Sequence, residues 1–141
     1  MSLALRFPYV DLKPSLVGAS RMPYVPLTLT NGSRTIHESG LLDTGATINV
    51  LPYPIGIQLG LDWTSQKTPV QLSGNLAAAP TYAIVVTATI GSFPSVRLAF
   101  AWTQAANIPI ILGQINFFLA FDVCFFRTLA EFELRPSQKP Q

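Results

Sequence analysis

The chemically most informative stretch of the sequence is residues 41–52, which contain the triplet Asp43-Thr44-Gly45. Two leucines lead into this triplet, and a largely apolar, strand-like run leaves it. Glycine permits a tight turn and a close backbone approach that a larger side chain would prevent. The pattern therefore predicts a buried strand that turns sharply and holds the carboxylate of Asp43 at the apex. A carboxylate held in this way can exchange a proton with a bound water as a general acid or base.

Other kinds of catalytic site find little support in the composition. The chain has a single histidine, His37, and a single cysteine, Cys124, so it cannot build a zinc-type ligand set or an internal disulfide. His37 lies in a polar stretch beside Glu38 without a nucleophile-elbow pattern, and we predict that it is exposed and not catalytic. Cys124, between Val123 and Phe125, is predicted to be a small buried hydrophobe. We expect no metal and no cofactor.

Length and charge narrow the class of protein. Apolar residues make up 49% of the 141 residues and charged residues only 11%, which is about half the usual charged share. This length predicts one domain over residues 1–141, with much surface buried by folding, by self-association or by both. The nine basic residues form no run and the net charge is +2, so nucleic acid is not expected as a partner.

Membrane and export signals are also not expected. The most apolar later runs, residues 82–90 and 115–126, are far shorter than the ~20 residues of a membrane helix. Residues 1–5 meet Arg6 too soon to form the apolar region of a signal peptide. We therefore expect no membrane partner and a cytoplasmic location.

The elements that must position Asp43 are predicted to be strands. Twelve prolines and nine glycines divide the chain into short pieces rich in Val, Ile, Thr and Phe. Val25, Leu27 and Leu29 fall on one side of a strand, and Asn31-Gly32 then favours a tight hairpin because both residues tolerate positive φ. Strands are expected at residues 6–10, 24–30, 68–72, 81–90, 93–102, 107–113, 121–126 and 131–135, short helices at 54–59 and 114–120, and a hairpin tip at 73–80.

A second segment repeats one feature of the Asp43 turn. Residues 110–113, Ile-Ile-Leu-Gly, form another apolar strand that ends at a glycine. The two segments, with the hairpin tip between them and a short helix after them, resemble one subunit of the retropepsin-like aspartic proteases over roughly residues 25–134. The resemblance implies an all-β fold, a closed acid-protease barrel with a flap hairpin and one or two short helices. A second Asp-Thr/Ser-Gly, which a two-lobed pepsin arrangement would need, is absent from the sequence.

The same resemblance implies roles for individual residues. Asp43 would be the catalytic carboxylate of an aspartic endopeptidase, and a two-fold homodimer would supply the second carboxylate. Thr44 and Gly45 would support the active-site loop, with the Thr44 hydroxyl bonded to the partner's loop. The strands at residues 6–10 and 131–135 would be the most able to pair across the two-fold axis. An extended peptide would bind as an added strand. Its expected contacts are Ala46, Thr47, Ser73, Gly74, Asn75 and Ile111.

Two features depart from the family pattern. Retroviral members often carry acidic residues directly after the Asp-Thr-Gly-Ala, where this chain has Thr47 and Ile48. Their flap tip is rich in glycine, whereas residues 73–79 contain only Gly74. The alternative hypothesis is a non-enzyme, in which the same fold serves as a dimerisation or peptide-binding module with negligible turnover.

Overall fold

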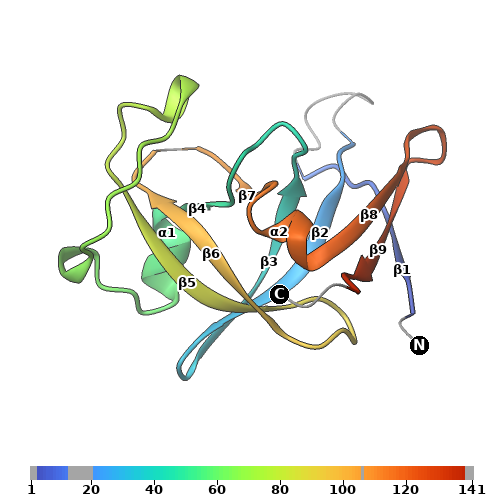
Figure 1. Ribbon diagram of the computed structural model, residues 1–141, viewed down its shortest axis with the longest axis horizontal. Coiled ribbons are helices and arrows are strands. Elements are labelled where there is room, and N and C mark those ends of the chain that lie inside the picture. The colour runs from blue at the N-terminus through green and yellow to red at the C-terminus, as the bar shows by residue number, and fades with distance from the viewer. Residues whose placement is uncertain (1–2, 13–20, 106, 139–141) are drawn as a thin grey trace.

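The computed structural model of the protein describes residues 3–12, 21–105 and 107–138. Strands dominate these residues, as predicted, and form a closed barrel and a separate three-stranded sheet (Figure 1). The strands are β1 Leu5–Pro8, β2 Tyr24–Asn31, β3 Arg34–Leu42, β4 Val50–Pro52, β5 Thr81–Thr89, β6 Val96–Thr103, β7 Ile110–Leu112, β8 Phe121–Phe126 and β9 Glu131–Pro136. The helices are α1 Tyr53–Gln58 and α2 Phe117–Ala120, and 3-10 turns lie at Trp63–Ser65, Gly74–Leu76 and Arg127–Leu129.

The barrel follows the order β2-β3-β7-β4-β6-β5. Val25, Leu27 and Leu29 of β2 point into it and are at most 3% exposed, which confirms the predicted alternation. The hairpin between β2 and β3 turns at Gly32 and Ser33, one residue later than predicted, because Asn31 still pairs with Arg34. Gly32 has a φ of +59°. Strands β3 and β7 are parallel neighbours and pair in register from Gly40↔Ile110 to Leu42↔Leu112. The two apolar segments noted in the sequence therefore end side by side at one end of the barrel.

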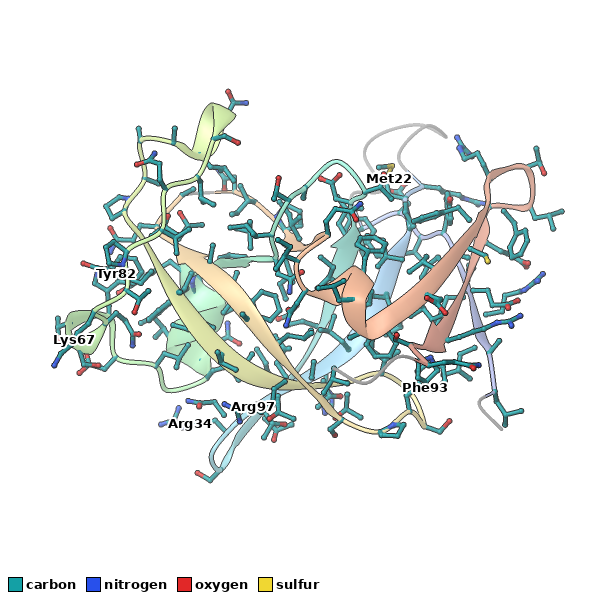
Figure 2. All side chains as sticks on the ribbon, in the orientation of Figure 1. Met22, Arg34, Lys67, Tyr82, Phe93 and Arg97 are labelled. Carbon is teal, nitrogen blue, oxygen red and sulfur yellow. The ribbon has the colours of Figure 1, made fainter. Side chains whose placement is uncertain are left out.

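An aromatic cluster closes the side of the barrel next to α1. The fully buried Trp102 has its ring centroid 4.9 Å from that of Trp63 and 5.6 Å from that of Tyr53. Tyr82, labelled in Figure 2, lies 4.8 Å from Trp63 by the same measure. The indole N–H of Trp102 donates to the Tyr53 carbonyl over 3.1 Å. Trp63, Tyr82 and Trp102 are therefore packing residues.

The three-stranded sheet has the order β1-β9-β8. Phe132 and Leu134 of β9 are fully buried and belong to the same core cluster as the barrel residues. On the outer face, Arg6 bonds Glu133 over 3.1 Å and Arg135 bonds the same carboxylate over 2.9 Å. Because β9 lies between two strands, it has no free edge. The prediction that the strand at residues 131–135 is among those most able to pair across a two-fold axis was therefore wrong, since both of its edges are occupied by β1 and β8 of the same chain.

Two further expectations differ from the structure. The predicted strand at residues 68–72 makes only an isolated bridge, Pro69↔Tyr82. The segment at residues 121–126 is a strand, but Phe121 is its only buried residue because β8 is an edge strand with one face open to solvent. Cys124 is accordingly exposed, not buried as predicted, and Asp122 faces out. Within the described ranges, no helix combines the length and apolar character needed to cross a membrane.

Candidate active site

Asp43 directly follows β3, at the apex of a sharp turn. Its backbone N–H donates to the Leu112 carbonyl over 3.0 Å, which ties the end of β3 to the end of β7. The Gly45 N–H donates to Asp43 Oδ1 over 2.9 Å, and the Ala46 N–H donates to the Asp43 carbonyl over 3.1 Å. A side chain at Gly45 would begin 3.3 Å from Asp43 Oδ1. The glycine therefore lets the turn close tightly around a carboxylate that it also binds.

The second apolar segment fixes the outgoing half of this loop. The N–H groups of Gln114 and Ile115 donate to the carbonyls of Ala46 and Thr47 over 2.9 and 2.7 Å. A Cβ atom at Gly113 would lie only 2.8 Å from the Ala46 carbonyl oxygen and 2.6 Å from that of Ile48. No side chain fits there without moving backbone. These bonds also explain why α2 begins at Phe117 and not at the predicted residue 114.

A buried amide that was not predicted from the sequence joins the two segments from inside. Asn49 is fully buried, and its Oδ1 accepts the Gly113 N–H over 2.8 Å. Its Nδ2 donates to the Ala99 carbonyl and to Asn116 Oδ1, both over 3.0 Å. The available signal was a lone asparagine between Ile48 and Val50 in an otherwise apolar run.

A cavity of about 540 Å³ lies beside the turn. The carboxylate of Asp43 is the one ionisable group among its described lining residues. Of the predicted site residues, Asp43, Gly45, Ala46, Thr47, Ser73 and Ile111 line this cavity. Thr44, Gly74 and Asn75 are exposed and are not among its lining residues. The structure thus brings the Asp43 loop, β7 and the flap together around one carboxylate. The flap is residues 68–80, with its arm at 68–72 and its tip at 73–80.

Apolar side chains form most of the remaining wall. Ile48 and Val50 come from the strand that leaves the turn, and Val70, Leu72 and Leu76 come from the flap. These five were not predicted from the sequence as cavity residues. Their signal was present: residues 46, 48 and 50 alternate along the outgoing run, and residues 70 and 72 alternate in the flap arm.

The flap is held by its own backbone and by one glutamine. The Val70 N–H donates to the Thr81 carbonyl over 3.0 Å, and the Ala83 N–H donates to the Thr68 carbonyl over 2.8 Å. Near the tip, Gln71 Nε2 donates to the carbonyls of Leu72 and Ala77, both over 3.0 Å. The flap arm is therefore bonded mainly through backbone groups, although it forms no regular strand.

The sequence profile described as aspartyl protease matches residues 25–115. This range covers the barrel up to the end of the Gly113 segment and includes both the Asp43 turn and the flap. The chain belongs to the aspartyl protease family. It is accordingly a peptide hydrolase, and the family suggested by the Asp43 and Gly113 segments is confirmed.

Solved structures agree with the fold of this aspartyl protease. A retropepsin-like aspartic protease from Rickettsia conorii superposes with a TM-score of 0.69 at 14% identity, covering 96% of this chain and 94% of that one. The EIAV protease, solved in complex with the inhibitor HBY-793, gives a TM-score of 0.50 at 19% identity, covering 70% of this chain and 88% of that one. Both likenesses support the retropepsin-like barrel. No curated protein sequence matches the chain.

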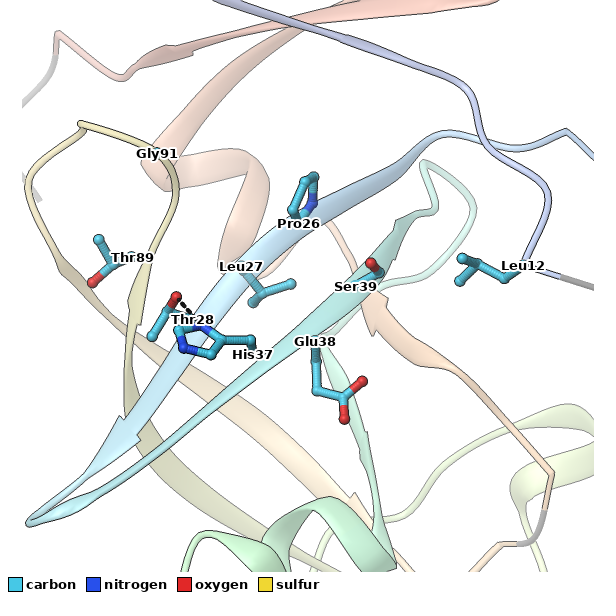
Figure 3. Close-up of a pocket in the computed structure, with 9 residues that line it drawn as sticks. All are labelled: Leu12, Pro26, Leu27, Thr28, His37, Glu38, Ser39, Thr89 and Gly91. Atoms are coloured by element: carbon cyan, nitrogen blue, oxygen red, sulfur yellow. Dashed lines mark hydrogen bonds between the residues drawn. The ribbon is translucent and has the colours of Figure 1, made fainter.

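The protease also has a cavity of about 490 Å³ on the outer face of the β2–β3 hairpin (Figure 3). His37 lies there and shares a hydrogen bond of 2.9 Å with the Thr28 hydroxyl, beside Glu38. His37 is exposed, as predicted, and Asp43 is not among the residues lining this cavity. Within the described ranges, no group of three or more His, Cys, Asp or Glu side chains could hold a metal ion.

Proposed function

We propose that this aspartyl protease cleaves peptide bonds as a two-fold homodimer in which the Asp43 carboxylates of both subunits activate one water. The observation that carries the proposal is the position of Asp43: its carboxylate is bound by the Gly45 N–H at the apex of the turn, beside a cavity with apolar walls. One chain supplies one such carboxylate, and a two-fold interface places identical residues face to face.

The chemistry requires the two carboxylates to share one proton. The ionised Asp43 draws a proton from the water, and the protonated Asp43 of the other subunit polarises the scissile carbonyl. Two negative charges a few ångströms apart resist simultaneous ionisation, so the pair keeps a singly protonated form over a range of pH. Activity is therefore expected to peak on the acid side of neutral.

The proposed substrate is an extended peptide that lies between the Asp43 loop and the flap. Ala46, Thr47 and Ile111 from the barrel and Ser73 from the flap line the cavity in which it would bind. Gly74 and Asn75 lie at the flap tip, where we propose that they contact the peptide after a second subunit closes the cleft. The apolar walls support apolar side chains next to the cleaved bond.

The free edge of β8 is the proposed contact between subunits. Within the described residues, β8 pairs only with β9, and it has six residues without a proline, whereas β1 has four and ends at Pro8. Exposed apolar side chains gather on β8 and the segment that leads to it: Ile115 is 54% exposed, Leu119 58% and Phe125 36%. Antiparallel pairing of two β8 strands about a two-fold axis would satisfy the open edge and cover these side chains.

We propose that residues 1–141 act as one domain in the cytoplasm. The barrel and the three-stranded sheet share one core cluster, which supports a single folding unit. The single cysteine, which cannot form an internal disulfide, fits a reducing compartment.

The test is cleavage of a peptide library by wild type and by the Asp43→Asn variant. This substitution is nearly isosteric and removes the titrating group, so cleavage should stop while the fold remains. The Asp62→Asn variant is the matched control, because an asparagine can still accept the Thr64 N–H and hydroxyl that Asp62 Oδ1 accepts at 3.0 and 2.8 Å. Retained cleavage by Asp43→Asn would contradict the proposal. Peptide binding without turnover by wild type, insensitive to transition-state-mimicking inhibitors, would favour a binding module instead.

A further inference from the structure

The peptide unit between Thr44 and Gly45 carries two hydrogen bonds, one at each end. Its N–H, on Gly45, donates to Asp43 Oδ1 over 2.9 Å. Its carbonyl, on Thr44, accepts from the side-chain amide of Gln114, whose Nε2 is 2.9 Å away. Because a peptide unit is planar, a donor that fixes its carbonyl also fixes the direction of its N–H. The Gln114 side chain is thus connected to the Asp43 carboxylate through one rigid group.

Gln114 is well placed for this bond by the same loop. Its backbone N–H donates to the Ala46 carbonyl over 2.9 Å, so the residue is anchored two positions beyond Thr44. The orientation of the side-chain amide is settled by its partner, because a carbonyl can accept only from the NH₂ end. The side chain therefore needs little further ordering to reach Thr44.

This contact lies at the surface, outside the core. Gln114, Thr44 and Gly45 are all exposed, and Gln114 is not a residue that lines the cavity beside Asp43. A neutral hydrogen bond at an exposed position contributes little to the free energy of folding. Loss of this hydrogen bond would instead change the direction in which the Gly45 N–H points. Hydrogen bonds in series also polarise one another, so losing the Gln114 donor weakens the Gly45 N–H as a donor.

We propose that Gln114 is a positioning residue for peptide hydrolysis: it orients the Thr44–Gly45 peptide so that the Gly45 N–H holds Asp43 in its reactive position. The inference rests on the proposed catalytic role of Asp43. Gln114 touches neither the substrate nor the water, and it acts through the loop backbone. A carboxylate that is free to rotate would spend less time aligned with the shared proton and the water, which lowers kcat and leaves peptide binding unchanged.

Three substitutions at position 114 separate the effect of hydrogen-bond donation to the Thr44 carbonyl from the effects of side-chain size and charge. Gln114→Met keeps a side chain of similar length and has no donor. Gln114→Glu keeps the shape, but an ionised carboxylate only accepts. Gln114→Arg places an Nε–H as many bonds from Cα as the glutamine Nε2, so the arginine can still donate to the Thr44 carbonyl. We expect kcat to fall about tenfold for the Met and Glu variants, the effect of roughly one hydrogen bond, and to stay within about twofold for the Arg variant.

The measurements are kcat, KM and the thermal unfolding midpoint, taken at protein concentrations where specific activity no longer rises. Gln58→Met, at an exposed glutamine in α1, is the control and should match wild type. Lower kcat with unchanged KM and midpoint supports positioning. Wild-type kcat for Gln114→Met, a change in KM alone, or an equal fall for Gln114→Arg would overturn it. Full activity of Asp43→Asn would remove the catalytic assignment itself, whereas an inactive Asp43→Asn with an unaffected Gln114→Met would overturn only the role of Gln114.

Discussion

The side chain of Asn49 and the backbone of Gly113 are joined by a 2.8 Å hydrogen bond in the interior of the barrel. Asn49 comes six residues after Asp43, and Gly113 directly follows β7. This bond fastens the strand that leaves the Asp43 turn to the segment that supports it. The amide occupies a place where an apolar side chain would pack but could bond nothing, so its presence indicates that loop geometry is maintained by buried polar contacts.

Replacing Asn49 should destabilise the protein strongly. Asn49→Ala removes the acceptor of the Gly113 N–H and the donor to the Ala99 carbonyl, and leaves buried polar groups without partners. We expect a loss of about 2–4 kcal/mol in the free energy of unfolding, measured by urea denaturation. Asn75→Ala, at the exposed flap tip, should change it by less than about 0.5 kcal/mol. Equal stability of the two variants would show that the buried amide is dispensable.

Gly56→Ala should destabilise the protein, although helix propensity favours alanine. Alanine is better than glycine in a helix interior by about 1 kcal/mol. A Cβ atom at Gly56 would, however, lie 2.2 Å from Cε2 and Nε1 of Trp102, whose ring is fully buried and packed against Tyr53 and Trp63. Overpacking of this kind costs about 1–3 kcal/mol, so Gly56→Ala should be destabilising and should change the tryptophan fluorescence. Gln58→Ala in the same helix provides the comparison, and stabilisation by both changes would contradict the packing argument.

The outer face of the three-stranded sheet should weaken in acid. Arg135 and, next, Arg6 hydrogen-bond the Glu133 carboxylate and hold its pKa below the ordinary glutamate value. A lowered pKa means that this contribution to stability is complete above the unfolded-state pKa and is lost as pH falls through the folded-state pKa. Wild type should therefore lose more stability than Glu133→Gln below about pH 4–5, where an ordinary glutamate takes up its proton. Urea midpoints of both proteins from neutral to acid pH, with Glu38→Gln as control, test this. Parallel curves for wild type and Glu133→Gln would contradict it.

The parts of the site that could be predicted are those with a local pattern. Asp43, Gly45 and Gly113 stand at the ends of apolar runs, and a turn needs only neighbouring residues to specify it. Asn49 and Gln114 could not be assigned in this way, because their partners, Gly113 and Thr44, lie far along the chain. A sequence shows that such a side chain is polar, but the bond depends on which strands become neighbours.

The same limit explains the errors in the fold. The run Phe121–Phe126 is almost entirely apolar, and composition alone favours burial. Its place at the edge of the sheet leaves Cys124 exposed. The central position of β9 was missed for a related reason: its register with β1, Leu5↔Leu134, joins the two ends of the chain. No local pattern encodes a pairing between residues so far apart.

The last prediction tests the subunit contact, using two isoleucines that are exposed on different parts of the surface. Ile115 is 54% exposed on the segment leading to α2 and β8, and Ile57 is 44% exposed on α1, on the far side of the barrel in Figure 1. If two copies meet along β8, Ile115→Asp places a charge in the buried contact, whereas Ile57→Asp leaves its charge in water. Ile115→Asp should weaken the dimer at least about tenfold in sedimentation equilibrium, and its specific activity should recover in part as protein concentration rises, since assembly follows mass action. Ile57→Asp should match wild type in both measurements. Equal dimerisation of the two variants would exclude the β8 surface as the contact between subunits. A monomer that is fully active at all concentrations would exclude a pair of Asp43 carboxylates shared between two subunits.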